Sequence, residues 1–191
     1  MMTQVIRLFA QSSDQVRPLP IDPYFCPTKK ITMNSSKIEI GQQAPEFSLY
    51  DSDKKKVSLT DFKGKNVLLL FFPQAFTGTC TKELCSTRDN IALYNQANAQ
   101  VLGISVDSIF TLAKYKEEQQ LNFPLLSDFN KEVSATWGVL YDTFVFDMRG
   151  VSKRSAFVLD KEGKIRYAEI LEAATDLPDF VAIQKTLQEL N

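Results

Sequence analysis

Two cysteines lie close together in this sequence, Cys80 and Cys85, and a third, Cys26, lies far upstream. The sequence contains no histidine, which excludes Cys–His and Ser–His catalysis and argues against a haem site. Two cysteines without histidine are also too few for a zinc site. We therefore predict no metal and no cofactor, and we interpret the close pair as a redox centre.

Length, composition and charge bear on the class of protein and on its partners. The 191 residues fit one domain, and 44% hydrophobic and 24% charged residues are ordinary for a globular protein. A net charge of −1 gives no electrostatic reason to expect nucleic acid or an acidic membrane as a partner, and no apolar run is long enough for a bilayer. With few cysteines and no secretion signal, we expect a reducing cytoplasm.

The elements around Cys80 predict a reactive thiol. The apolar run Val67–Phe72 is typical of a strand buried on both faces, and Pro73 ends it because proline has no N–H to donate. A short loop follows, in which Thr77 and Thr79 are candidate helix N-caps. Cys80 would then lie in the first turn of a helix, where unpaired N–H groups favour the thiolate.

This helix is predicted to extend to about Asn98. On a helical wheel, Arg88 falls near the face of Cys80, together with Leu84 and Thr87. We therefore predict that this face is turned inward and that Arg88 accompanies it.

Residues 1–37 differ from the rest of the chain, because prolines crowd a polar segment of weak periodicity. We expect this segment to be disordered or a non-native extension, with Met33 as an alternative start. Cys26 within it is interpreted as a bystander. The ordered domain is assigned to residues 38–191.

The remaining patterns predict an α/β layer fold. Strands are expected at 47–50 and 56–59 (a β-hairpin), 101–106, 156–159 and 164–171, a short apolar piece at 123–126, and helices at 110–120, at 133–137 and after Asp176 as cap with Pro178 in the first turn.

Pro73, Thr77 and Cys80 match the motif P-x-x-x-T-x-x-C, followed by Glu83, and Arg154 precedes a predicted core strand. On these residues the chain resembles the peroxiredoxin family, from about Ile38 onward. The spacing of Cys80 and Cys85 is similar to that of the peroxiredoxin Q (bacterioferritin comigratory protein) group. The resemblance implies a thioredoxin-like fold, a central mixed sheet flanked by helices, with an N-terminal β-hairpin.

The resemblance also implies a function. Such a protein reduces hydrogen peroxide and organic hydroperoxides through a sulfenic acid on Cys80, which Cys85 resolves, and thioredoxin or a similar dithiol recycles it. Thr77, Arg154 and Pro73 would complete the active site. Glu83 is expected to be a structural partner for an arginine. Either a monomer or a homodimer is compatible with the sequence.

The spacing of Cys80 and Cys85 on one helix is incompatible with a disulfide between them while the helix is intact. Five residues along a helix separate the Cα atoms by about 7.5 Å along the axis and rotate the side chains by about 140°. A disulfide needs Cα atoms within about 7 Å and converging Cβ atoms. If Cys85 resolves, the first turns of the helix must unwind.

Other interpretations stay open at this point. Cys80 alone is compatible with a buried structural thiol, and Cys85 with an ordinary helix residue in a one-cysteine enzyme. Arg88 has Asp89 and Glu83 as alternative partners. A thioredoxin-type disulfide oxidoreductase is disfavoured because it normally uses C-x-x-C, and a non-enzymatic redox sensor or holdase is the third class.

Overall fold

The central strand β3 (Asn66–Phe71) organises the fold, and all six of its residues are buried. It pairs in parallel with β4 (Ala99–Ser105) and antiparallel with β6 (Ser155–Leu159). Both edges of β3 are therefore covered, and the predicted strand at Val67–Phe72 is confirmed. The computed structural model describes residues 38–191, so the predictions for residues 1–37 and for Cys26 lie outside the described residues.

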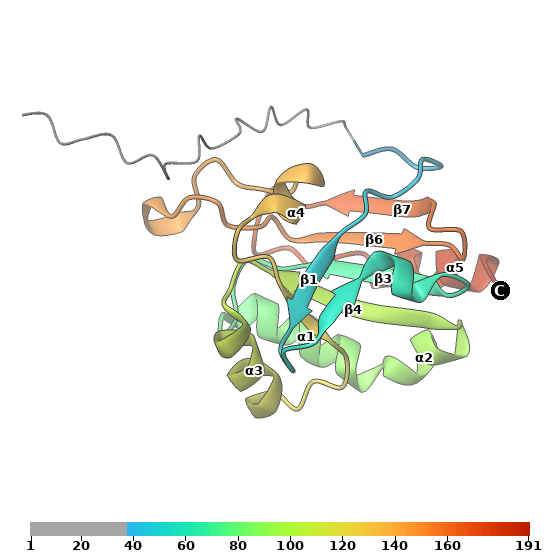
Figure 1. Cartoon of the computed structure of the whole chain (residues 1–191), viewed down its shortest axis with the longest axis horizontal. Coiled ribbons are helices and arrows are strands. Elements are labelled where there is room, and N and C mark those ends of the chain that lie inside the picture. Colours follow the sequence, from blue (N-terminus) through green and yellow to red (C-terminus); the bar gives the residue numbers. More distant parts are fainter. Residues whose placement is uncertain (1–37) are drawn as a thin grey trace, which may run out of the picture. The chain divides into compact units, whose positions relative to one another are not determined.

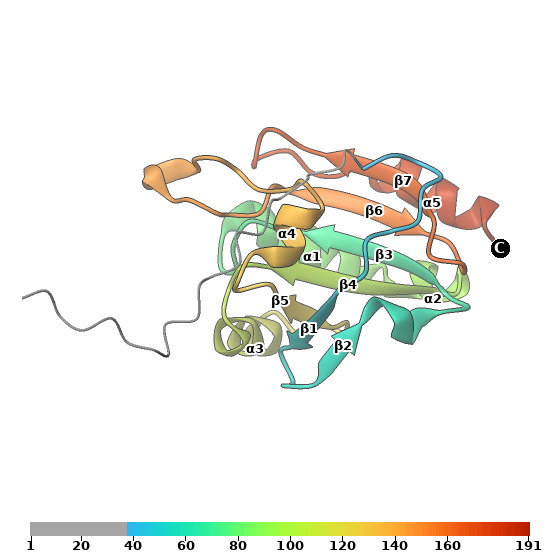
Figure 2. The same ribbon diagram turned by 45° about the horizontal axis from the view of Figure 1, so that its top comes forward.

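The described residues form one seven-stranded mixed sheet in the order β2-β1-β5-β4-β3-β6-β7 (Figures 1 and 2). The second half of the short apolar piece at 123–126 is part of this sheet, because Leu125 and Leu126 begin β5, which pairs in parallel with β4 and antiparallel with β1. The other strands are β1 (Ser48–Asp51), β2 (Lys56–Ser58), β5 (Leu125–Ser127) and β7 (Ile165–Ile170).

Successive residues of β3 point to opposite faces of the sheet and enter two separate hydrophobic cores. Leu68 and Leu70 belong to the core formed with α1 (Gly78–Asp89), α2 (Ile91–Gln96), α3 (Ile109–Glu118) and α5 (Phe180–Glu189). Val67 and Leu69 belong to the other core, which contains Trp137 after α4 (Glu132–Thr136). Two 3₁₀ turns lie at Leu59–Phe62 and Val145–Asp147.

The helix that carries Cys80 is shorter than predicted. It ends at Asp89, and Asn90 leaves the helical conformation before α2 begins. The Asn90 side-chain amide donates to the carbonyl of Ser86 at 2.8 Å, a local bond that competes with continuation of the helix. The prediction of one helix to about Asn98 is therefore wrong.

The C-terminal helix also starts later than predicted. Asp179, not Asp176, is its N-cap, and its carboxylate accepts from the N–H groups of Val181 and Ala182, both at 3.0 Å. Pro178 therefore precedes the helix instead of lying in its first turn. The Asp176 N–H instead closes a turn onto the Ala173 carbonyl at 3.1 Å.

Both predicted antiparallel strand pairs are present. β1 pairs with β2 around the polar turn after Asp51, and β6 pairs with β7 around the turn that Gly163 completes. Gly163 has φ +80°, which glycine adopts without strain. Among the helices of residues 38–191, none combines the length and hydropathy that crossing a bilayer requires.

Candidate active site

Cys80 is the third residue of α1, as the sequence predicted for the first helical turn. The helix begins at Gly78 with Thr77 as its N-cap residue. The Cys80 side chain is only 1% exposed. The N–H groups of a first turn have no intrahelical acceptors and form the positive end of the helix dipole. Cys80 therefore lies at the positive end of the α1 dipole.

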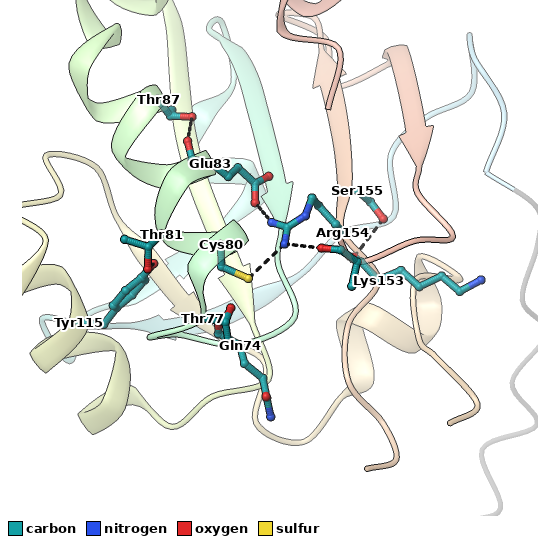
Figure 3. A network of polar contacts seen from close by, with 11 residues as sticks. Gln74, Thr77, Cys80, Thr81, Glu83, Thr87, Tyr115, Lys153, Arg154 and Ser155 are labelled. Atoms are coloured by element: carbon teal, nitrogen blue, oxygen red, sulfur yellow. Dashed lines mark hydrogen bonds and ion pairs between the residues drawn. The ribbon is translucent and has the colours of Figure 1, made fainter. Parts of the chain in front are cut away.

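Arg154 directly precedes β6 and connects Cys80 to the rest of the site (Figure 3). Its Nη2 donates to Cys80 Sγ at 3.3 Å and to the carbonyl of Ala174 at 3.0 Å. Its Nη1 donates to the carboxylate of Glu83, one turn after Cys80 on the same helix. The guanidinium is thus held between a sulfur, a carboxylate and a backbone carbonyl, with both charged side chains fully buried.

Burial governs the electrostatics of this pair. Burial raises the pKa of Glu83 to about 7, although the charge and hydrogen bond of Arg154 oppose the rise. Burial alone would lower the pKa of Arg154, but the charges of Glu83 and Cys80 more than offset it and the pKa is raised. Arg154 therefore remains a cation beside Cys80 Sγ, where a positive charge favours the thiolate.

Among the described residues, two atoms of the ion pair have no hydrogen-bond partner: Glu83 Oε1 and Arg154 Nε. The carboxylate is therefore satisfied on one oxygen alone, which accords with its raised pKa.

Two hydrogen bonds fix the loop between β3 and α1, one to Asp107 and one within the loop. Pro73 is buried, and the N–H of Ala75 donates to Asp107 Oδ2 at 2.8 Å. Thr77 is the N-cap residue, yet its side chain accepts no bond from the helix. Its hydroxyl instead donates to the carbonyl of Gln74 at 2.9 Å. In this conformation its single proton is engaged within the loop, and only its lone pairs are free.

The chain is similar in sequence and fold to known proteins. The model of the AhpC/TSA family matches residues 40–168. The chain belongs to this family, the peroxiredoxins. It is 40% identical to peroxiredoxin Bcp of Escherichia coli over 131 residues, 68% of this chain and 84% of that protein.

Further relatives agree. Over 131 residues the chain is 39% identical to chloroplastic peroxiredoxin Q of Oryza sativa subsp. japonica, covering 69% of this chain and 58% of that one. The crystal structure of peroxidoxin BcpB from Mycobacterium tuberculosis superposes with a TM-score of 0.72 at 29% identity, covering 81% of this chain and 99% of that one. The chain is thus a peroxidase of the peroxiredoxin type, and the predicted likeness to the Bcp and peroxiredoxin Q group is confirmed.

The second cysteine of this peroxiredoxin lies on another side of α1. Cys85 is half-buried, and its Sγ donates to Gln119 Oε1 at 3.6 Å, just beyond the end of α3. Within residues 38–191 both cysteines are free thiols. Since α1 is unbroken between them, the two sulfurs point in different directions.

Arg88 does not join Cys80, contrary to the expectation from the helical wheel. Its Nε pairs with Asp89 at 2.8 Å and its Nη1 donates to the carbonyl of Gln119. Arg88 lies two turns from Cys80, which is about 12 Å along the axis. Its long side chain extends sideways to the end of α3. The alternative partner Asp89 is the one observed.

Sequence reasoning missed two groups of this site. The carbonyl of Ala174 lies after β7 and has no signature in the sequence, because any residue carries one. Tyr115 is buried in α3, and its hydroxyl donates to Thr81 Oγ1 at 3.0 Å in the first turns of α1 (Figure 3). The sequence can indicate that Tyr115 lies on the buried face of a helix. Its contact with Thr81 cannot be predicted in this way, because it depends on how α3 packs against α1.

Proposed function

We propose that this peroxiredoxin reduces hydrogen peroxide and organic hydroperoxides with Cys80 as the nucleophile. The observation that carries the proposal is the contact of 3.3 Å between Arg154 Nη2 and Cys80 Sγ in a buried site. A fixed cation and a helix N-terminus converge on one sulfur. Both favour the anionic form that attacks a peroxide.

In the first step the thiolate sulfur attacks one peroxide oxygen and the O–O bond breaks. The bonding electron pair leaves with the other oxygen as hydroxide or alkoxide, which then takes a proton from solvent. Cys80 becomes a sulfenic acid, and the peroxide is reduced to water or an alcohol. Arg154 is placed to stabilise the negative charge as it moves from sulfur to oxygen.

Two loop residues support this step. Thr77 orients the peroxide through its hydroxyl, which accepts a hydrogen bond in the present conformation or donates one after release from Gln74. Pro73 keeps water from the buried end of the site and offers no competing N–H.

Cys85 then resolves the intermediate. Its thiol condenses with the sulfenic acid, an S–S bond forms and water leaves. The geometry of an intact helix forbids this bond, so α1 unwinds between the two cysteines. The exposed disulfide is then reduced by an external dithiol, for which thioredoxin is the expected class.

The decisive experiment is the mass of the protein after one equivalent of hydrogen peroxide, with peptide mapping. A disulfide between Cys80 and Cys85 within one chain supports the complete cycle. A sulfenic or sulfinic acid on Cys80 with Cys85 still free indicates a one-cysteine enzyme. No change at Cys80 overturns the peroxidase mechanism, and Cys80→Ser provides the unreactive control.

The role of Arg154 is tested by two substitutions. Arg154→Met removes the charge, and Arg154→Lys keeps the charge but loses the planar fork that reaches three acceptors. We expect the rate of Cys80 oxidation to fall by about 100-fold in Arg154→Met and by less in Arg154→Lys. Stopped-flow measurement with hydrogen peroxide checks this, and an unchanged rate in both variants would contradict the assigned role.

A further inference from the structure

Arg154 Nη2 has two acceptors, and one of them lies outside the chemistry of the reaction. It donates to Cys80 Sγ at 3.3 Å and to the Ala174 carbonyl at 3.0 Å. A nitrogen shared between two acceptors takes a position that depends on both. Whatever fixes Ala174 therefore helps to fix the distance between Nη2 and Cys80.

Ala174 belongs to the irregular segment 171–176 between β7 and α5. At its start the N–H of Leu171 donates to the carbonyl of Arg154 at 2.9 Å. Apart from the turn that the Asp176 N–H closes onto the Ala173 carbonyl, the rest of the segment belongs to no strand or helix. Its position therefore depends mainly on bonds that anchor it to neighbouring elements.

Glu172 provides two such anchors. Its carboxylate accepts from Lys153 Nζ at 2.8 and 2.9 Å, and its backbone carbonyl accepts from the Tyr141 hydroxyl at 3.1 Å. The Lys153 ammonium also lies 5.6 Å from the centre of the Tyr141 ring. We call these three residues, Tyr141, Lys153 and Glu172, the Glu172 clamp.

The clamp is separate from the buried ion pair. In Figure 3 the side chains of Lys153 and Arg154 extend in opposite directions from the chain, and only Arg154 points toward Cys80. The side chain of Glu172 is 81% exposed and that of Lys153 19%. The clamp thus binds the backbone and the side chain of Glu172, and its hydrogen bonds go neither to Cys80 nor to the guanidinium of Arg154.

We propose that Tyr141, Lys153 and Glu172 are positioning residues for peroxide reduction. By holding Glu172 in place, the clamp keeps the neighbouring Ala174 carbonyl where it aligns Arg154 Nη2 with Cys80 Sγ. The inference rests on the function proposed above. It assigns to three residues outside the motif a share in the rate of Cys80 oxidation.

Three substitutions that change the charge differently distinguish loss of the clamp from an electrostatic effect through space. Lys153→Met removes a positive charge near the site, Glu172→Gln removes a negative one, and Tyr141→Phe removes none. A field acting through space would slow the first variant, accelerate the second and leave the third unchanged. Loss of the clamp slows all three.

The measurement is the rate of Cys80 oxidation by hydrogen peroxide, followed by mass, with Cys85→Ser present throughout so that the first step is isolated. We expect each clamp variant to lose about two- to fivefold in rate, the range that a partly exposed ion pair or one hydrogen bond allows. The swapped pair Lys153→Glu with Glu172→Lys should recover part of the loss. The matched control is Lys114→Met and Glu117→Gln, an exposed pair at 3.1 Å on α3, for which we expect no change.

A double-mutant cycle tests whether the clamp affects Cys80 through Arg154. In an Arg154→Met background the clamp variants should cause no further loss, because the group that they position is absent. An equal loss in both backgrounds, opposite signs for Lys153→Met and Glu172→Gln, or a normal rate in Tyr141→Phe would each overturn the proposal. Failure of the proposed function looks different, since Cys80 would then resist oxidation even with the clamp intact.

Discussion

Glu83 and Arg154 form an ion pair without access to water, which is an expensive arrangement. Each ion loses its hydration on folding, and their mutual attraction recovers this cost only in part. Glu83 reflects the imbalance directly, because burial raises its pKa to about 7. The pair is therefore better explained by the orientation of the guanidinium beside Cys80 than by a gain in stability.

The substitution Glu83→Gln tests, through the pH dependence of stability, whether burial raises the pKa of Glu83. A carboxyl whose pKa rises from 4.5 to about 7 on folding keeps its proton in the folded state while the unfolded chain loses it. The free energy of unfolding therefore falls as pH rises through that window, and is level above it. We expect the free energy of unfolding of the native protein, minus that of Glu83→Gln, to decrease by about 1 to 3 kcal/mol from pH 4.5 to 7.

Urea unfolding at several pH values measures this difference. All other titrating groups are common to the two proteins and cancel in it. A difference that stays constant, or grows with pH, would contradict a raised pKa for Glu83.

The residues of the site differed in how well the sequence could predict them. Cys80 and Glu83 lie on one helix, so their spacing already places them a turn apart. Arg154 was found through the family resemblance, since its distance from Cys80 depends on the pairing of β6 with β3. Arg88 shares the helix with Cys80, but the wheel cannot foresee that Asp89 and Gln119 bind its long side chain.

At the level of elements, side chains of α3 and of its C-terminal end bind α1, the helix that unwinds in the proposed cycle. Tyr115 donates to Thr81, and Gln119 accepts from Cys85 and, through its carbonyl, from Arg88. The bonds of Thr81 and Cys85 lie within the segment that unwinds in the proposed cycle, and we expect both to break before Cys80 and Cys85 meet. We therefore expect the contacts of α3 with α1 to oppose formation of the proposed disulfide and to prolong the lifetime of the sulfenic acid.

Tyr115→Phe removes one of these bonds while keeping the ring. We expect disulfide formation to accelerate by up to about fivefold, the value of one hydrogen bond, and less Cys80 to be overoxidised to sulfinic acid at high peroxide. Rapid quenching followed by mass measurement gives both quantities. Tyr167→Phe is the matched control, because it removes a hydroxyl bound to Glu169 on β7; equal behaviour of the two variants would refute the hold by α3.

Sequence patterns predicted some elements better than others for a clear reason. The run Val67–Phe72 encodes its burial in every residue, so β3 was readable. The end of α1 at Asn90 depends on one side-chain bond to Ser86, which composition does not reveal. The strand β5 has three residues, and it is a strand only because β4 and β1 lie beside it.

For the whole domain, the two cores on either face of the sheet determine stability. Leu69 is fully buried in the core that does not contain Cys80. We expect Leu69→Ala to lower the free energy of unfolding by about 2 to 5 kcal/mol, with normal peroxide reactivity in the protein that remains folded. Leu93→Ala, at a position 44% exposed, should change stability by less than about 0.5 kcal/mol.

Denaturant unfolding and peroxide kinetics on the same samples check this separation. A loss of reactivity in folded Leu69→Ala would show that the second core also shapes the site. At this scale the fold class could be predicted from the order of strands and helices, whereas the position of β5 between β1 and β4 could not, because it joins strands far apart in the chain.

One feature of α1 links the catalytic cycle to the solvent. Glu83 lies between Cys80 and Cys85, so the unwinding of α1 in the proposed cycle would carry away the partner of Arg154. In water the pKa of this carboxyl would return to its ordinary value, and near neutrality Glu83 would release its proton in those molecules in which burial had retained it. Resolution would therefore discharge a proton beyond those of the thiol chemistry, and a more alkaline medium would shift the balance toward the unwound helix that a reductant can reach.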